Sequence, residues 1–208
     1  TSVMAGRTFF EHVVEFAHRY NIIVCHDAAY TEIYYEEKPM SFLEIEGAKD
    51  VGIEFHSLSK TFNMTGWRIG FAVGNKTLVE ALGKVKTNID SGVFQAIQYA
   101  GIEALANTQS AIEETRVVYE ERKNVMTEGL KSMGIEVFPC MASFYLWCKV
   151  PKGFTSASFC SHLLKEAAIV FTPGNGFGEE GEGYFRIALT VGVERMKEAL
   201  ERIRKVGL

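Results

Sequence analysis

Apolar and polar residues alternate in blocks that predict strands and helices along the whole chain. Apolar residues recur at helical spacing over residues 8–20, which predicts an amphipathic helix. The run IIVC after Asn21 is short, apolar and rich in β-branched residues, a pattern typical of a strand buried on both faces of a parallel sheet. Residues 51–59 and 67–74 are two further candidate strands. Because strands and helices alternate, we expect an α/β fold.

A long amphipathic stretch over residues 108–133 separates two parts of the chain. It ends before Gly134, and glycine favours the position after a helix. The pattern changes beyond this helix, so we expect one domain over residues 1–125 and a smaller α+β domain over residues 126–208. The other expected elements are helices over 75–85, 94–106, 156–167 and 193–206, and strands over 135–138, 144–150, 168–174 and 184–190.

Composition narrows the classes of function. The 208 residues are 47% hydrophobic and 23% charged, values that are ordinary for a globular protein. No apolar run approaches the roughly 20 residues that span a bilayer. The net charge of −4 argues against nucleic acid or an anionic membrane as a partner. The four cysteines form no CxxC motif, so we expect a reducing cytoplasm, no metal site, and a small buried apolar role for each cysteine.

One candidate for chemistry lies after the first strand, in the segment HDAAY. Asp27 follows the apolar run directly, so it is expected at the carboxyl end of a strand, where open α/β sheets bind ligands. The alternative is that Asp27 only caps a turn. Tyr30 has a comparable alternative as a core aromatic residue with an exposed hydroxyl group.

A second candidate is the lysine in HSLSKTFNMTGWRIGFAVGN. Ser57 and Ser59 alternate at a strand end, so both hydroxyl groups can point the same way. With Arg68 they form a candidate clamp for a phosphate monoester. Lys60 beside such a clamp is a candidate Schiff-base nucleophile, although a lone lysine is more often a surface residue. Pyridoxal phosphate would satisfy the lysine, the clamp and the carboxylate of Asp27 together.

Three segments of this sequence resemble motifs of the class I aminotransferases, which are fold-type I enzymes dependent on pyridoxal phosphate. They are HDAAYTEIYY, SLSKTFNMTGWRIGFAVGN and PGNGFGEEGEGYFRIALT, in the order that the family shows. The resemblance implies that residues 1–125 are the C-terminal part of a large cofactor-binding domain with a mixed, mostly parallel sheet. The residues of the lysine motif are similar to those in the LL-diaminopimelate, aspartate and alanine branch of these aminotransferases.

The resemblance also implies a role for individual residues. Lys60 matches the lysine that forms the Schiff base with the cofactor and then moves the α-proton of the substrate. Asp27 matches the carboxylate that keeps the pyridine nitrogen protonated, and Tyr30 the phenol that hydrogen-bonds the 3-oxygen of the ring.

The resemblance also implies which residues bind the phosphate of the cofactor and the carboxylate of the substrate. Ser57, Ser59 and Arg68 match the groups that bind the cofactor phosphate. Arg186 matches the arginine that binds the α-carboxylate of the substrate, for which a planar guanidinium suits a bidentate contact. Its alternative is a surface arginine on an edge strand.

One motif of the family is incomplete. Its members carry Asn-Pro-Thr-Gly shortly before this point, and Thr1-Ser2 resembles the end of that motif, with Ser2 in the place of the glycine. We therefore expect a C-terminal fragment of a longer aminotransferase, weakly active or inactive alone. Family members are homodimers, so a homodimer is expected at full length.

Three functions remain open at this point. The first is an aminotransferase that moves an amino group between an amino acid and a 2-oxo acid by a ping-pong mechanism. The second is a carbon–sulfur β-lyase of the same fold, which uses the same lysine, aspartate and arginines. The third is an aminotransferase-like ligand-sensing domain of a transcription regulator, which the acidic balance and the lack of a helix-turn-helix signal disfavour.

Overall fold

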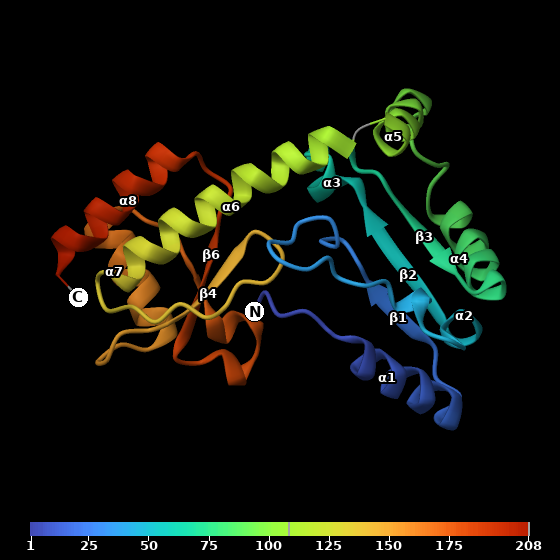
Figure 1. Ribbon diagram of the computed structural model, residues 1–208, viewed down its shortest axis with the longest axis horizontal. Coiled ribbons are helices and arrows are strands. Elements are labelled where there is room, and N and C mark those ends of the chain that lie inside the picture. Colours follow the sequence, from blue (N-terminus) through green and yellow to red (C-terminus); the bar gives the residue numbers. More distant parts are fainter. Residues whose placement is uncertain (108, 208) are drawn as a thin grey trace. The chain divides into compact units, whose positions relative to one another are not determined.

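The computed structural model describes residues 1–107 and 109–207 and divides the chain into two compact units (Figure 1). The N-terminal unit is Met4–Thr115, and the C-terminal unit is Arg116–Leu208 together with Thr1–Val3. The division falls inside helix α6 (Gln109–Lys131), and the boundary expected from the sequence lies further along the same helix. The assignment of residues 1–125 and 126–208 to a large and a small domain stays a prediction.

A mixed three-stranded sheet forms the centre of the N-terminal unit. Its strands are β1 (Val24–Asp27), β2 (Gly52–Ser57) and β3 (Gly70–Gly74), in the spatial order β1-β2-β3. Strands β1 and β2 are parallel, with Asp27 opposite Phe55, whereas β3 is antiparallel to β2. Because β1 and β2 are parallel, their carboxyl ends meet at one edge of the sheet.

Helix α1 (Arg7–Tyr20) shows why the sequence pattern predicts this part of the fold well. Its buried residues Phe10, Val14 and Ala17 lie on one face at helical spacing, and Phe10 and Val14 pack in a core cluster with Phe42. The helix ends at Tyr20, and Asn21 caps it in a left-handed conformation. The other helices of the unit are η1 (Phe42–Glu44), α2 (Ala48–Val51), α3 (Leu58–Thr61), η2 (Thr65–Trp67), α4 (Lys76–Ile89) and α5 (Gln95–Asn107).

The expectation that the run IIVC is buried on both faces is wrong in the part of the chain that the structure describes. Ile22 and Ile23 precede the strand and are 44% and 57% exposed. Helix α1 covers one face of β1, through a contact of Phe10 with His26, and Cys25 on the other face is exposed. The small buried role expected for all four cysteines therefore holds for Cys148 and Cys160, fails for Cys25, and is only partly met by the half-buried Cys140.

An antiparallel sheet forms the centre of the C-terminal unit. Its strands are β4 (Tyr145–Lys149), β5 (Thr172–Pro173) and β6 (Tyr184–Ala188), in the order β4-β6-β5. Helices α7 (Ser156–Ala167) and α8 (Val193–Val206) have the bounds that the sequence predicts. Two short 3-10 helices, η3 (Gly174–Phe177) and η4 (Glu179–Gly181), lie between β5 and β6. The core includes the fully buried side chains of Leu146, Phe159, Leu163, Phe185 and Ile203.

Two expected strands are shorter or absent in the described residues. Residues 135–138 make a single bridge, between Val137 and Cys148, before Pro139, which lacks the N–H that would continue a ladder. Residues 168–174 are paired only at Thr172 and Pro173, and Ala168 caps the end of α7 in a left-handed conformation. None of the described helices has the length and apolar character needed to cross a membrane.

Candidate functional site

The parallel strands place two predicted site residues at the same edge of the N-terminal sheet. Asp27 is the last residue of β1, and Ser57 is the last residue of β2. The N–H of Ala28 donates to the carbonyl oxygen of Phe55 at 2.8 Å, so the pairing with β2 continues to the end of β1. The Asp27 carboxylate is exposed and accepts a bond from the N–H of Ala29 at 3.3 Å. Asp27 thus presents its carboxylate where ligands bind in sheets of this type.

Lys60 and Tyr30 lie close together, each just beyond one of these strands. Lys60 is in helix α3, directly after β2, and Tyr30 is in the turn after β1. The Nζ atom of Lys60 lies 5.8 Å from the centre of the Tyr30 ring, and both side chains are half-buried. The structure thereby brings together the amine and the phenol that the sequence assigned to one site.

The two serines have different surroundings. The hydroxyl oxygen of Ser57 accepts a bond from the N–H of Ser59 at 3.2 Å, which caps helix α3. A hydroxyl group can still donate its hydrogen while it accepts, so this contact is compatible with a phosphate ligand. Ser59 is only 7% exposed, and its carbonyl oxygen accepts a bond from the hydroxyl group of Thr65 at 3.0 Å.

Arg68 adopts an unusual backbone conformation in this region. Its φ of 53° is left-handed, which costs a residue other than glycine about 1–2 kcal/mol. The Nη1 atom donates to the carbonyl oxygen of Thr65 at 2.8 Å, and the side chain is otherwise exposed. Because a guanidinium group has five N–H donors, this bond leaves donors that can bind a phosphate. The acid, the phenol, the amine and the anion-binding donors of the N-terminal unit therefore fit pyridoxal phosphate.

Arg186 lies in the C-terminal unit on β6, where it is paired with Trp147 on β4 and Thr172 on β5. The centre of its guanidinium group is 4.2 Å from the centroid of the Tyr145 ring and 4.2 Å from that of the Phe177 ring. Contacts with two aromatic rings restrict the side chain and leave the edge of the guanidinium for a carboxylate.

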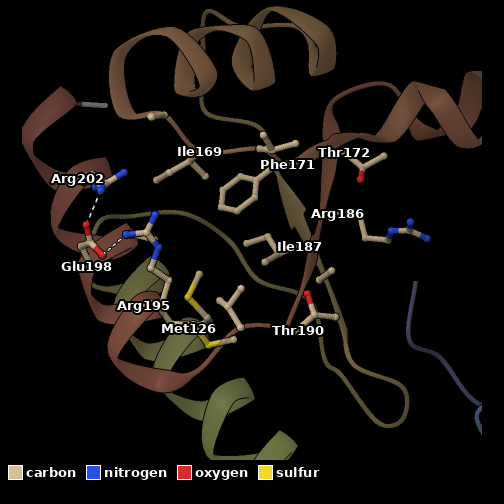
Figure 2. A pocket seen from close by; sticks show the side chains of 16 residues that line it. Met126, Ile169, Phe171, Thr172, Arg186, Ile187, Thr190, Arg195, Glu198 and Arg202 are labelled. Atoms are coloured by element: carbon tan, nitrogen blue, oxygen red, sulfur yellow. Dashed lines mark hydrogen bonds and ion pairs between the residues drawn. The ribbon is translucent and has the colours of Figure 1, made fainter. Parts of the chain in front are cut away.

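A cavity of about 270 Å³ lies beside strand β6, and the residues that line it include Arg186 and Ile187. Figure 2 shows the side chain of Arg186 pointing away from this cavity, whereas Ile187 and Phe171 point into it. In the cavity wall the carboxylate of Glu198 accepts hydrogen bonds from Arg195 and Arg202. The guanidinium group of Arg186 is thus directed away from the centre of this cavity.

Ser2 contacts the strand that carries one of these rings. Its hydroxyl group donates to the carbonyl oxygen of Tyr145 at 2.6 Å and lies 3.0 Å from that of Ser143. Its φ of 58° is in the left-handed region that glycine favours. The place of Ser2 in the family motif stays a prediction.

The structure also contains a charged cluster that the sequence analysis missed. Glu54 in the middle of β2 is 1% exposed. Its carboxylate lies 2.8 Å from Nδ1 of His26 and 2.7 Å from Nε2 of His56. It also accepts bonds from the hydroxyl group of Ser41 at 2.9 Å and from the N–H of Phe42 at 3.0 Å. The signal in the sequence was a single carboxylate between apolar residues in the predicted strand VGIEF.

Glu54 is ionised in this environment. Burial by itself raises the pKa of a carboxyl group, but the hydrogen bonds from His26, Ser41 and His56 outweigh burial and hold the pKa of Glu54 at about 2. The cluster is therefore built around a buried negative charge. Among the described residues, no group of three His, Cys, Asp or Glu side chains has the arrangement of a metal site.

Comparison with known proteins covers the whole chain. A family model described as "Aminotransferase class I and II" matches residues 1–203. The LL-diaminopimelate aminotransferase of Aquifex aeolicus is 58% identical over 209 residues, which cover 100% of this chain and 54% of that protein. The LL-diaminopimelate aminotransferase of Moorella thermoacetica is 55% identical over 207 residues, covering 99% and 53%. The chain thus spans about half the length of the curated relatives it matches.

Solved structures are similar over the same extent. BacF from Bacillus subtilis is 37% identical with a TM-score of 0.96, covering 100% of this chain and 53% of that one. A probable N-succinyldiaminopimelate aminotransferase from Thermus thermophilus is 34% identical with a TM-score of 0.91, covering 98% and 55%.

Proposed function

Because the chain belongs to the class I and II aminotransferase family, we propose that it carries the lysine of a pyridoxal-phosphate-dependent aminotransferase. This enzyme moves an amino group between an amino acid and a 2-oxo acid by a ping-pong mechanism. The observation that carries the proposal is the position of the Lys60 amine, 5.8 Å from the centre of the Tyr30 ring, beyond the strand ends that present Asp27 and Ser57.

Lys60 has two proposed tasks. Its amine would hold the cofactor covalently, and the same amine, when free, would accept the proton that leaves the α-carbon of the substrate. The bound cofactor supplies an electron sink for this proton transfer. Asp27 keeps the proton on the pyridine nitrogen, since an exposed carboxylate at the strand end can accept that N–H. The hydroxyl group of Tyr30 donates to the 3-oxygen of the ring.

The remaining predicted residues bind anions. Ser57, Ser59 and Arg68 donate hydrogen bonds to the cofactor phosphate, and each charge-assisted bond contributes about 1.5–3 kcal/mol. The left-handed backbone of Arg68 supports its assignment, because strained residues persist where the surrounding structure holds them for a function. Arg186 binds the α-carboxylate of the substrate, for which its placement between two aromatic rings prepares it.

The proposed amino donor is LL-diaminopimelate. Support comes from the two relatives above, which bear this name and are 58% and 55% identical over essentially the whole chain. We also propose that the full-length protein is a homodimer in the cytoplasm. The exposed apolar side chains near the end of α4 and on α5 support a subunit interface, because Ile89, Phe94, Tyr99 and Ile102 are between 62% and 77% exposed.

The test of the proposed function uses the full-length protein with added pyridoxal phosphate. We expect it to convert LL-diaminopimelate and a 2-oxo acid into a new amino acid, detected by chromatography, with the initial-rate pattern of a ping-pong mechanism. Release of ammonia and pyruvate from a cysteine conjugate, without amino transfer, would instead identify a β-lyase. Light scattering of the same preparation measures the oligomeric state.

A further inference from the structure

The cluster of His26, Glu54 and His56, called the Glu54 cluster below, surrounds the buried Glu54 carboxylate and lies on the two strands that end at the proposed site. Strand register places His26 directly opposite Glu54, and Glu54 contacts the imidazoles of both histidines. The carboxylate accepts two further hydrogen bonds, from Ser41 and from the N–H of Phe42. A buried carboxylate with this many donors holds its neighbours strongly, because moving one of them away leaves a buried charge without a partner.

Each imidazole in the cluster has a defined proton. An ionised carboxylate only accepts hydrogen bonds, so Nδ1 of His26 and Nε2 of His56 must each carry a hydrogen where they face Glu54. The rings are also packed. His56 stacks on Phe71 of β3 with centroids 4.8 Å apart, and His26 meets the ring of Phe10 edge-on at 5.2 Å. The Glu54 cluster is therefore fixed by hydrogen bonds within the sheet and by aromatic contacts around it.

The cluster lies immediately before the proposed cofactor residues in both strands. His26 precedes Asp27, and His56 precedes Ser57. Because successive side chains of a strand point to opposite faces, Asp27 and Ser57 face the other side of the sheet from the histidines. A slip of one residue between the strands would separate His26 from Glu54 and also turn Asp27 to the wrong face. Glu54 contacts His26 across this pair of strands, so the contact stabilises the register in which Asp27 and Ser57 share a face.

We propose that Glu54 is a positioning residue that sets the spacing between Asp27 and Ser57. This inference rests on the proposed function, in which Asp27 binds the pyridine nitrogen and Ser57 binds the phosphate of one rigid cofactor. Both ends of the cofactor are satisfied together only when the two strand ends are held in register. Glu54 holds them from the opposite face through His26 of β1, while His56 fixes the Glu54 carboxylate within β2.

Comparison of two ligands tests this role without measuring turnover. Pyridoxal has the ring and aldehyde of pyridoxal phosphate but no phosphate. The dissociation constant of pyridoxal divided by that of pyridoxal phosphate therefore measures the contribution of the phosphate contacts. In the full-length protein we expect Glu54→Gln to lower this ratio by about tenfold, the effect of losing one charge-assisted hydrogen bond. Glu46→Gln makes the same chemical change at an exposed position and should leave the ratio unchanged.

The outcomes separate the two proposals. Equal weakening of both ligands by Glu54→Gln, or no weakening, overturns the positioning role while the proposed function stands. Wild-type protein that binds neither ligand overturns the proposed function and the positioning role with it.

A second pair of variants keeps the inference testable if Glu54→Gln does not fold. His26→Asn places an amide donor near the position of Nδ1, which contacts Glu54 across the strands, whereas His26→Phe keeps a ring of similar size without a donor. We expect the ratio of dissociation constants to be retained in His26→Asn and lowered in His26→Phe, with circular dichroism confirming that both fold. The same ratio in both variants would overturn the positioning role.

Discussion

The amine of Lys60 and the ring of Tyr30 lie 5.8 Å apart, measured from Nζ to the ring centre, although they belong to segments separated by a whole strand. Their proximity follows from the parallel pairing of β1 with β2, since each residue lies shortly beyond the carboxyl end of its strand. A lysine that forms a covalent bond to an aldehyde and a phenol that bonds the neighbouring ring oxygen must be this close. The distance between Lys60 and Tyr30 is therefore compatible with the roles proposed for them.

Lys60→Ala in the full-length protein should abolish the visible absorbance of the covalently held cofactor. It should also lower the rate of transamination by at least about 10²–10⁴-fold, the usual contribution of a general acid–base group. Lys84→Ala on the exposed side of α4 is the matched control and should leave both unchanged. Reduction with borohydride followed by peptide mapping adds a direct check, because a label at any position other than 60 contradicts the assignment.

Arg186→Lys should raise KM for the amino acid substrate without altering cofactor absorbance. Lysine keeps the positive charge but cannot make two parallel bonds to a carboxylate, so we expect kcat/KM to fall by about 10–100-fold. Steady-state kinetics with the amino donor varied measures this effect. Arg195→Lys is a suitable control, since Arg195 contacts Glu198 in the same unit. An unchanged KM in Arg186→Lys would assign the substrate carboxylate to another residue.

The spacing of apolar residues along the chain predicted helices and strands whose buried faces repeat at regular intervals. Helix α8 was predicted to the residue because Met196, Leu200 and Ile203 recur at helical spacing and form its buried face. The expected strand over residues 51–59 continued two residues too far, because the side chain of Ser57 caps helix α3 at that point. The family and its α/β fold were predicted correctly from three motifs, and the family match over residues 1–203 confirms them.

The Glu54 cluster could not be predicted in the same way. Its members His26 and Ser41 come from segments well upstream of Glu54, and only the pairing of β1 with β2 brings them together. In the sequence, Glu54 is a charged residue at a position that the apolar pattern predicts to be buried, and the sequence does not identify its partners. Such a conflict is itself informative, because a buried charge requires partners from elsewhere in the fold.

The depressed pKa of Glu54 predicts a loss of stability in acid. The pKa is about 2 in the folded protein, against an ordinary value of 4.5. The folded state therefore resists protonation more than the unfolded state, so the contribution of Glu54 is fully present above pH 4.5 and is lost as the pH falls toward 2. Its size is roughly 3 kcal/mol.

Urea unfolding of the wild type and of Glu54→Gln at several pH values measures this contribution. We expect the wild type to be the more stable near neutral pH, and the difference in unfolding free energy to shrink steadily below pH 4.5, the ordinary value of a glutamate. Glu46→Gln, at an exposed position, should track the wild type throughout. A difference that stays constant down to the lowest pH would mean that Glu54 is not the group being titrated.

Close backbone approach at Gly181 predicts a link between fold and substrate binding in the C-terminal unit. A Cβ atom on Gly181 would lie 2.0 Å from the carbonyl oxygen of Gly174, where helix η3 begins, and that helix carries Phe177 against the guanidinium of Arg186. Gly181→Ala should therefore lower the unfolding free energy by about 1–3 kcal/mol and raise KM for the amino acid substrate.

Gly176→Ala is the matched control, because a Cβ atom there meets nothing within 4 Å. Thermal unfolding and steady-state kinetics of both variants check the prediction. Equal behaviour of the two would show that Phe177 is not held in place through this contact, since only one substitution forces the two backbone segments apart.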